Sequence, residues 1–117
     1  MEHFDITVIG SGPGGYVAAI RSAQLGYKTA IIEKYDTLGG TCTNVGCIPS
    51  KALLDSTHHF SDALHKFKVQ GIEVGEVQLN FKQMYDRKAD VVLKNTQGLE
   101  FLMKKNNITK LHGTASF

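Results

Sequence analysis

The sequence predicts an α/β fold with a parallel sheet, a βαβ unit at its start and long helices. Three observations support this class. A β-branched run over residues 4–9 leads into a glycine-rich turn and then into a helical pattern. A second apolar run over residues 28–33 completes a βαβ unit of about 30 residues. Residues 81–106 carry apolar side chains at a spacing near 3.6, which indicates one long amphipathic helix.

The first unit can be predicted residue by residue. Residues 4–9 (Phe-Asp-Ile-Thr-Val-Ile) end at a glycine, which is typical of a buried strand in a parallel sheet. We expect a helix from about Pro13 to Leu25, because proline suits a first helical turn. One face of that helix would carry Tyr16, Ala19, Ile20 and Ala23. Gly26 would end it, and residues 28–33 would form the second strand.

The remaining elements follow from composition and periodicity. Residues 34–46 are rich in Gly, Thr, Asp and Asn and predict a loop. We expect a helix from about residue 47 to 68, a short extended piece over 72–74, the helix over 81–106, and a strand over 109–117. No repeat or internal linker divides the chain. Its pattern is still running at the last residue, so we expect it to be incomplete at the C-terminus.

Composition excludes several classes of function. The chain has 117 residues, of which 42% are hydrophobic and 21% charged, so it is globular rather than disordered. A net charge of +2 is too small to indicate nucleic acid or an anionic membrane as a partner. No apolar run approaches the ~18 residues of a membrane span. Because a strand pattern begins at Phe4 with no leader before it, we expect a cytoplasmic protein.

The glycine-rich turn predicts a dinucleotide site. In Gly10-x-Gly12-x-x-Gly15, the first glycine permits the tight turn and the second allows close approach of a pyrophosphate. The third lets helix and strand pack closely, and the helix N-terminus attracts phosphate. Glu33 ends the second strand, where an acid hydrogen-bonds a ribose. The alternatives are a coincidental glycine turn and a solvated glutamate at the end of a strand.

The only two cysteines, Cys42 and Cys47, admit three interpretations. Free thiols often pack as small hydrophobic groups. A zinc site needs four ligands, and the chain adds only His58, His59 and His65 at poor spacing. A redox disulfide fits better, because Cys47 lies near a predicted helix start whose dipole stabilises a thiolate. In a cytoplasmic chain a structural disulfide is not expected.

Together these motifs resemble the pyridine nucleotide-disulfide oxidoreductases over the whole chain. The resemblance rests on the glycine turn over residues 10–15 and on residues 39–51, Gly-Gly-Thr-Cys-Thr-Asn-Val-Gly-Cys-Ile-Pro-Ser-Lys. The continuation over residues 48–54 is most similar to the branch of the family that oxidises dihydrolipoamide. The cysteine motif is highly specific, whereas many flavoproteins share the turn. The resemblance implies a Rossmann-like FAD-binding domain, with residues 1–117 as its N-terminal part and the NAD and dimerisation domains absent.

The resemblance also implies roles for individual residues. The FAD pyrophosphate would lie over residues 12–15 and the adenosine ribose on Glu33. Lys51 would stabilise the reduced flavin, although by itself it reads as an ordinary lysine on a helix surface. Backbone over residues 113–115 would contact the adenine. The implied cofactor-binding residues are Gly10, Gly12, Pro13, Gly14, Gly15, Glu33, Lys34, Gly39, Gly40, Thr41, Cys42, Lys51, Gly113 and Ala115.

The implied catalytic residues are Cys42, which meets the substrate dithiol, and Cys47, which faces the flavin as the charge-transfer thiolate. The activity would be reoxidation of protein-bound dihydrolipoamide, with NAD as the electron acceptor at a site outside this chain. Expected partners are the lipoyl domain of a 2-oxo acid dehydrogenase complex and a second subunit that supplies a His–Glu acid/base pair. These residues alone are expected to be inactive.

Other functions stay open at this point. Within the family, glutathione reductase and mercuric reductase share the cysteine spacing. A flavin-dependent oxygenase or oxidase shares the glycine turn but does not need the two cysteines. A non-enzymatic nucleotide-binding or redox-sensing module is the alternative from a different class.

Overall fold

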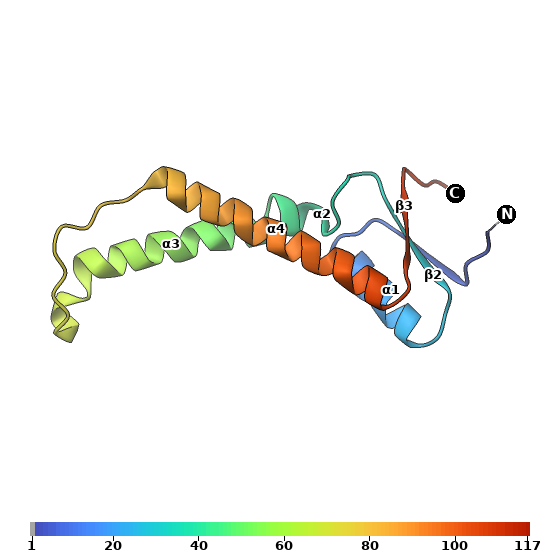
Figure 1. Cartoon of the computed structure of the whole chain (residues 1–117), viewed down its shortest axis with the longest axis horizontal. Coiled ribbons are helices and arrows are strands. Elements are labelled where there is room, and N and C mark those ends of the chain that lie inside the picture. Colours follow the sequence, from blue (N-terminus) through green and yellow to red (C-terminus); the bar gives the residue numbers. More distant parts are fainter. Residues whose placement is uncertain (1) are drawn as a thin grey trace.

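The computed structural model describes residues 2–117 and shows a small parallel sheet at the base of a long helical hairpin. Strands β1 (Ile6–Ile9), β2 (Thr29–Glu33) and β3 (Thr109–His112) lie side by side in that order, and both neighbouring pairs are parallel. The molecule measures 65 × 25 × 21 Å, because helices α3 and α4 extend away from the sheet (Figure 1). The α/β class with its parallel sheet is therefore confirmed.

Helix α1 (Pro13–Gln24) connects β1 to β2 as predicted, with proline at its first position. Gly26, two residues after the last helical residue, has φ +93°, a conformation that side chains other than glycine rarely adopt. The predicted apolar face is also confirmed. Ala19 is fully buried, and Tyr16, Ile20 and Ala23 pack around it against the core.

The connection from β2 to β3 is long and helical. It contains α2 (Gly40–Asn44), α3 (Cys47–His65), the short 3-10 helix η1 (Lys68–Gln70) and α4 (Phe81–Lys105). Asn80 caps α4, since its side-chain oxygen accepts a hydrogen bond from the backbone N–H of Gln83 at 3.0 Å. The predicted long helix is thus confirmed to within one residue.

Two sets of contacts hold these helices in place. Near the sheet, α1, β2 and α4 share one hydrophobic core, whose buried members are Ala19, Ile31, Leu38, Leu99, Met103 and Ile108. Further along the hairpin, Arg87 of α4 reaches α3. Its guanidinium donates to Asp55 Oδ2 at 2.8 Å and to the carbonyl oxygen of Ala52 at 2.9 Å.

One predicted loop is partly helical. Within residues 34–46, the structure contains α2, which the sequence pattern missed because glycine and threonine favour turns over helices. Local hydrogen bonds of one side chain stabilise this turn of helix instead. The Asn44 side-chain amide donates to the carbonyl oxygens of Leu38 at 3.1 Å and Gly40 at 2.9 Å.

Three other boundaries were predicted wrongly. The first strand begins at Ile6 rather than at residue 4, and α3 ends at His65 rather than at 68. The last strand ends at His112, opposite Glu33 where β2 itself ends. The Gly113 N–H still donates to the Glu33 carbonyl oxygen at 2.9 Å, and residues 114–117 pair with no strand of the described sheet. Residues 72–74, predicted as a short extended piece, have neither helix nor strand and pair with no strand of the described sheet.

Candidate functional site

The glycine turn brings the end of β1 against the start of α1. A Cβ atom added to Gly15 would lie 1.9 Å from the carbonyl oxygen of Gly10, so only glycine fits there. Gly10 itself has φ +89°. Gly12 precedes α1 without a side-chain cap, and the first turn holds no acidic residue. The positive end of the helix dipole is therefore available to an anion, as expected for a pyrophosphate site.

The cysteine segment packs directly on this turn. Gly39 and Gly40 have φ +106° and +61°, and a Cβ on Gly40 would lie 2.8 Å from the Gly12 Cα. The Gly39 N–H donates to the carbonyl oxygen of Ser11 at 3.0 Å. The two motifs therefore form one continuous structure, through contacts between residues 28 positions apart in the sequence.

Glu33 is buried at the end of β2 and is fully hydrogen-bonded. Its Oε2 accepts from the Ser11 N–H at 2.9 Å and the Ser11 hydroxyl at 2.6 Å. Its Oε1 accepts from the backbone N–H groups of Lys34 at 2.8 Å and Tyr35 at 3.1 Å. Burial raises the pKa of Glu33, but these four donors outweigh it and lower that pKa below the ordinary value.

A cavity of about 200 Å³ lies at the carboxyl ends of the strands. Its lining consists of Ile9, Gly10, Ile32, Glu33, Lys34, Gly113, Thr114 and Ala115. Five of these were predicted as cofactor-binding residues, and they come from segments more than 100 residues apart. Nucleotides bind at this edge of open parallel sheets. The glycine turn over residues 10–15, the uncapped N-terminus of α1 and the Glu33 carboxylate beside this cavity fit the adenosine diphosphate portion of a dinucleotide.

The two cysteines lie on neighbouring helices in the dithiol form. Cys42 is half-buried in α2, and Cys47 is the exposed first residue of α3, at the helix start that was predicted near it. The neighbouring Cys47 thiol is the main cause that raises the pKa of Cys42, followed by burial, whereas the Cys47 backbone N–H and the Lys51 ammonium oppose this shift. Two thiols in such contact suit reversible pairing.

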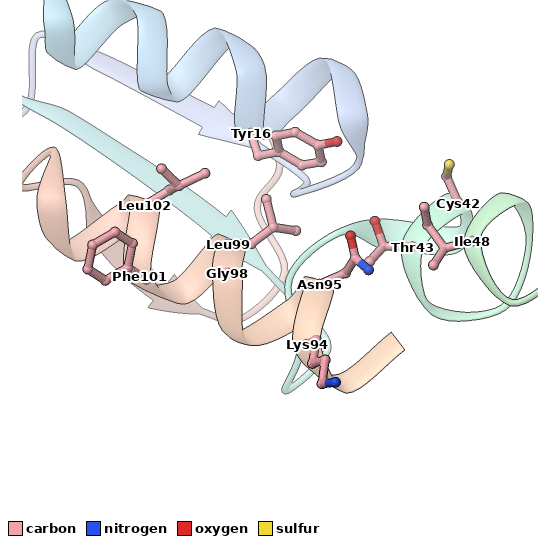
Figure 2. A pocket seen from close by; sticks show the side chains of 10 residues that line it. All are labelled: Tyr16, Cys42, Thr43, Ile48, Lys94, Asn95, Gly98, Leu99, Phe101 and Leu102. Carbon is pink, nitrogen blue, oxygen red and sulfur yellow. The ribbon is translucent and has the colours of Figure 1, made fainter. Parts of the chain in front are cut away.

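Cys42 also lines a groove of about 490 Å³ between α1, α2, α3 and α4 (Figure 2). Figure 2 shows Cys42 at the end formed by α2 and α3, and Phe101 and Leu102 of α4 toward the other end. The groove is lined by Tyr16, Cys42, Thr43, Ile48, Lys94, Asn95, Gly98, Leu99, Phe101 and Leu102. It gives an apolar molecule one approach to Cys42.

The predicted residues thus fall into two adjoining clusters. One is the cavity at the strand ends, and the other contains Thr41, Cys42, Cys47 and Lys51 near the start of α3. Pro13 and Gly14 lie exposed in the first turn of α1. Sequence reasoning missed Ser11, the buried hydroxyl inside the glycine turn, and Asn44, the amide between the cysteines. In the sequence, the only sign of a role for these two residues is that each has a polar side chain.

Two possible features are not found in the described part of the chain. Across residues 2–117, no helix is long and apolar enough to span a bilayer. Within the same range, no three His, Cys, Asp or Glu side chains gather closely enough to hold a metal ion.

A parallel sheet with a glycine turn at its strand ends, joined to a paired dithiol, defines a nucleotide-binding domain equipped for thiol–disulfide chemistry. Residues 4–117 match the profile of the family described as pyridine nucleotide-disulphide oxidoreductase. The chain belongs to this family, as its two motifs predicted.

Close relatives carry one name. The chain is 55% identical over 114 residues to "Dihydrolipoyl dehydrogenase, mitochondrial" of Schizosaccharomyces pombe, covering 97% of this chain and 22% of that protein. It is 56% identical over 110 residues to proteins of the same name from Sus scrofa and Homo sapiens, covering 93% of this chain and 22% of each. The chain therefore spans about a fifth of the length of these curated relatives.

These names correct one expectation. We predicted a cytoplasmic protein, whereas the relatives from Schizosaccharomyces pombe, Sus scrofa and Homo sapiens are all named mitochondrial. The prediction rested on the absence of a leader before Phe4, and such an absence does not identify a compartment.

Proposed function

We propose that residues 1–117 are the N-terminal part of the FAD-binding domain of a mitochondrial dihydrolipoyl dehydrogenase. The enzyme would reoxidise protein-bound dihydrolipoamide and use NAD as the electron acceptor. One observation carries the proposal: the Cys42–Cys47 dithiol is built directly onto a nucleotide-binding turn through the contact of Gly40 with Gly12. Relatives 55–56% identical bear the name of that enzyme.

The site residues divide the binding of FAD among them. The N–H groups at the start of α1, over residues 12–15, would hold the pyrophosphate. The cavity beside Glu33 would take the adenosine, with the adenine next to Gly113 and Ala115. Thr41 and Lys51 lie toward the cysteine pair and would approach the flavin. When bound, FAD supplies the two-electron chemistry that returns the dithiol to a disulfide and passes the electrons to NAD, whose site lies outside this chain.

The cysteines carry out the exchange with substrate. Starting from the Cys42–Cys47 disulfide, one dihydrolipoyl thiolate attacks the Cys42 sulfur, the protein S–S bond breaks, and Cys47 leaves as a thiolate. The second substrate thiolate then attacks the substrate sulfur of this mixed disulfide and expels Cys42. Two electrons pass from the substrate dithiol to the cysteine pair, lipoyl disulfide is released, and the substrate dithiol gives up two protons. Because the pKa of Cys42 is raised beside Cys47, the expelled Cys42 thiolate takes up a proton at neutral pH.

The apolar side chains exposed on the α3–α4 hairpin favour an interface with a second subunit. Several large apolar side chains project from the hairpin into solvent, namely Leu54, Leu64, Val69, Phe81 and Tyr85, with exposed fractions of 66, 50, 88, 63 and 54%. Surfaces of this kind mark interfaces. We infer that a second subunit of a homodimer covers part of the hairpin, and that the lipoyl domain of a 2-oxo acid dehydrogenase complex delivers the substrate dithiol.

Thiol counting tests this function. The purified chain is oxidised, treated anaerobically with dihydrolipoamide, and assayed for free thiols and for released lipoyl disulfide. We expect two thiols per chain to appear with one equivalent of lipoyl disulfide, and none in the Cys42→Ser variant. A chain that forms no Cys42–Cys47 disulfide on oxidation would contradict the proposal. Reduction by glutathione but not by dihydrolipoamide would favour a glutathione reductase-like enzyme.

A further inference from the structure

Ser11 is the most buried polar residue of the glycine turn, with 1% of its surface exposed. Its hydroxyl donates to Glu33 Oε2 at 2.6 Å. The same oxygen accepts from the Gly39 N–H at 3.2 Å, and the Ser11 carbonyl oxygen accepts from that N–H at 3.0 Å. The single side chain therefore contacts both the acid at the end of β2 and the residue that begins the cysteine segment.

These hydrogen bonds fix the orientation of the Ser11 O–H group. A hydroxyl has one proton, and at 2.6 Å from a carboxylate that proton belongs in the bond to Glu33. The oxygen lone pairs then face the Gly39 N–H. A change in the charge or position of the Glu33 carboxylate therefore changes the acceptor that Gly39 encounters.

Gly39 transmits that change to the cysteines. It immediately precedes Gly40, which is pressed against Gly12 with no room for a Cβ atom. Cys42 follows two residues later in α2. A segment with so little free space does not absorb a displacement of Gly39 locally, so the displacement reaches the Cys42 thiol.

We propose that Ser11 is a positioning residue whose hydroxyl couples the nucleotide-binding carboxylate of Glu33 to the geometry of the Cys42–Cys47 pair. The role of Glu33 in holding nucleotide rests on the proposed function. The coupling itself consists of contacts within the protein and exists without nucleotide. Occupation of the cavity at the strand ends would thereby adjust the readiness of the cysteine pair to form its disulfide.

The test compares Ser11→Ala with Thr96→Val, which removes another buried hydroxyl, one that donates to the Leu93 carbonyl oxygen in α4. Two quantities are measured on each full chain: the Glu33 pKa by carbon-13 NMR, and the equilibrium constant of the Cys42–Cys47 disulfide against glutathione. Ser11→Ala should raise the Glu33 pKa by about 1, since one hydrogen bond to a charged group is lost. It should change the disulfide constant by about threefold or more, near the lower end of the coupling energies of residues that share one network.

A raised Glu33 pKa with an unchanged disulfide constant would overturn the coupling, and so would an equal change in Thr96→Val. Ser11→Gly, which lacks the hydroxyl but suits a glycine-rich turn, repeats the comparison if the alanine variant does not fold. Neither measurement uses FAD or dihydrolipoamide, so failure of the proposed enzymatic function would leave this test intact.

Discussion

Replacing Glu33 with glutamine tests the hydrogen-bonding arrangement on which the site depends. The carboxylate accepts four hydrogen bonds, two at each oxygen, from Ser11, Lys34 and Tyr35. Glutamine has nearly the same shape but only one oxygen. Its NH2 group must therefore face either two backbone N–H donors or the N–H and hydroxyl of Ser11.

The lower-cost orientation directs the NH2 toward Ser11, because that hydroxyl can rotate and accept. The Ser11 N–H is then buried without a partner, at a cost of about 1–3 kcal/mol, and the surviving bonds lose their charge assistance. We expect Glu33→Gln to lower the free energy of unfolding at pH 7 by about 2–4 kcal/mol in total. For a domain of this size, that loss lowers the melting temperature by about 10 °C.

The assay is urea unfolding followed by circular dichroism, with Glu73→Gln, at an exposed position, as the control. The pH dependence supplies a second check. Because the pKa of Glu33 is lowered in the folded state, its contribution is complete above the unfolded pKa of about 4.3 and is lost as pH falls through the folded value. The difference between wild type and Glu33→Gln should therefore shrink below about pH 4.3.

Two results would refute this reasoning. A Glu33→Gln variant within about 0.5 kcal/mol of wild type at pH 7, the range of an ordinary surface change, would mean that the four donors contribute little. A difference that grew on acidification would mean that the folded state raises the Glu33 pKa instead of lowering it.

Three further predictions concern the turn, the thiols and the hairpin. Gly15→Ala should prevent folding, because its Cβ would meet the Gly10 carbonyl at 1.9 Å, whereas Gly14→Ala, with open space around it, should fold normally by circular dichroism. Cys47→Ala should lower the pKa of Cys42 toward its ordinary value, measured as the pH dependence of alkylation by iodoacetamide, and an unchanged profile would contradict the assigned cause. Arg87→Met should destabilise the chain by about 1 kcal/mol and speed amide exchange in α3 and α4, and unaltered exchange there would show that this contact does not hold the hairpin.

The fold was predictable where local patterns and tertiary contacts agree. Pro13, the β-branched strands and the 3.6 spacing over 81–106 all predicted elements that the structure contains. The pattern failed at α2 and at the end of β3. Helix α2 depends on specific hydrogen bonds of the Asn44 side chain, which composition does not reveal. Strand β3 ends where its distant partner β2 ends rather than where its own apolar residues end.

The same distinction applies to the site. Glycine positions and the Glu33 position follow from spacing, so the cavity at the strand ends contains residues named from sequence. The Ser11 contacts join residues 22 and 28 positions apart, and no local pattern encodes them. The apolar spacing over residues 81–106 does not show which side chains are buried, since Phe81 and Tyr85 are exposed on the hairpin whereas Leu99 lies in the core.

The most direct test of the central claim is the visible absorption spectrum of the protein with FAD, before and after anaerobic addition of dihydrolipoamide. We predict a protein-bound flavin spectrum that changes on addition of the dithiol and develops long-wavelength absorbance, with no such absorbance in the Cys47→Ser variant. FAD that binds while its spectrum is unaffected by dihydrolipoamide would contradict the claim that Cys42 and Cys47 link the substrate to the flavin.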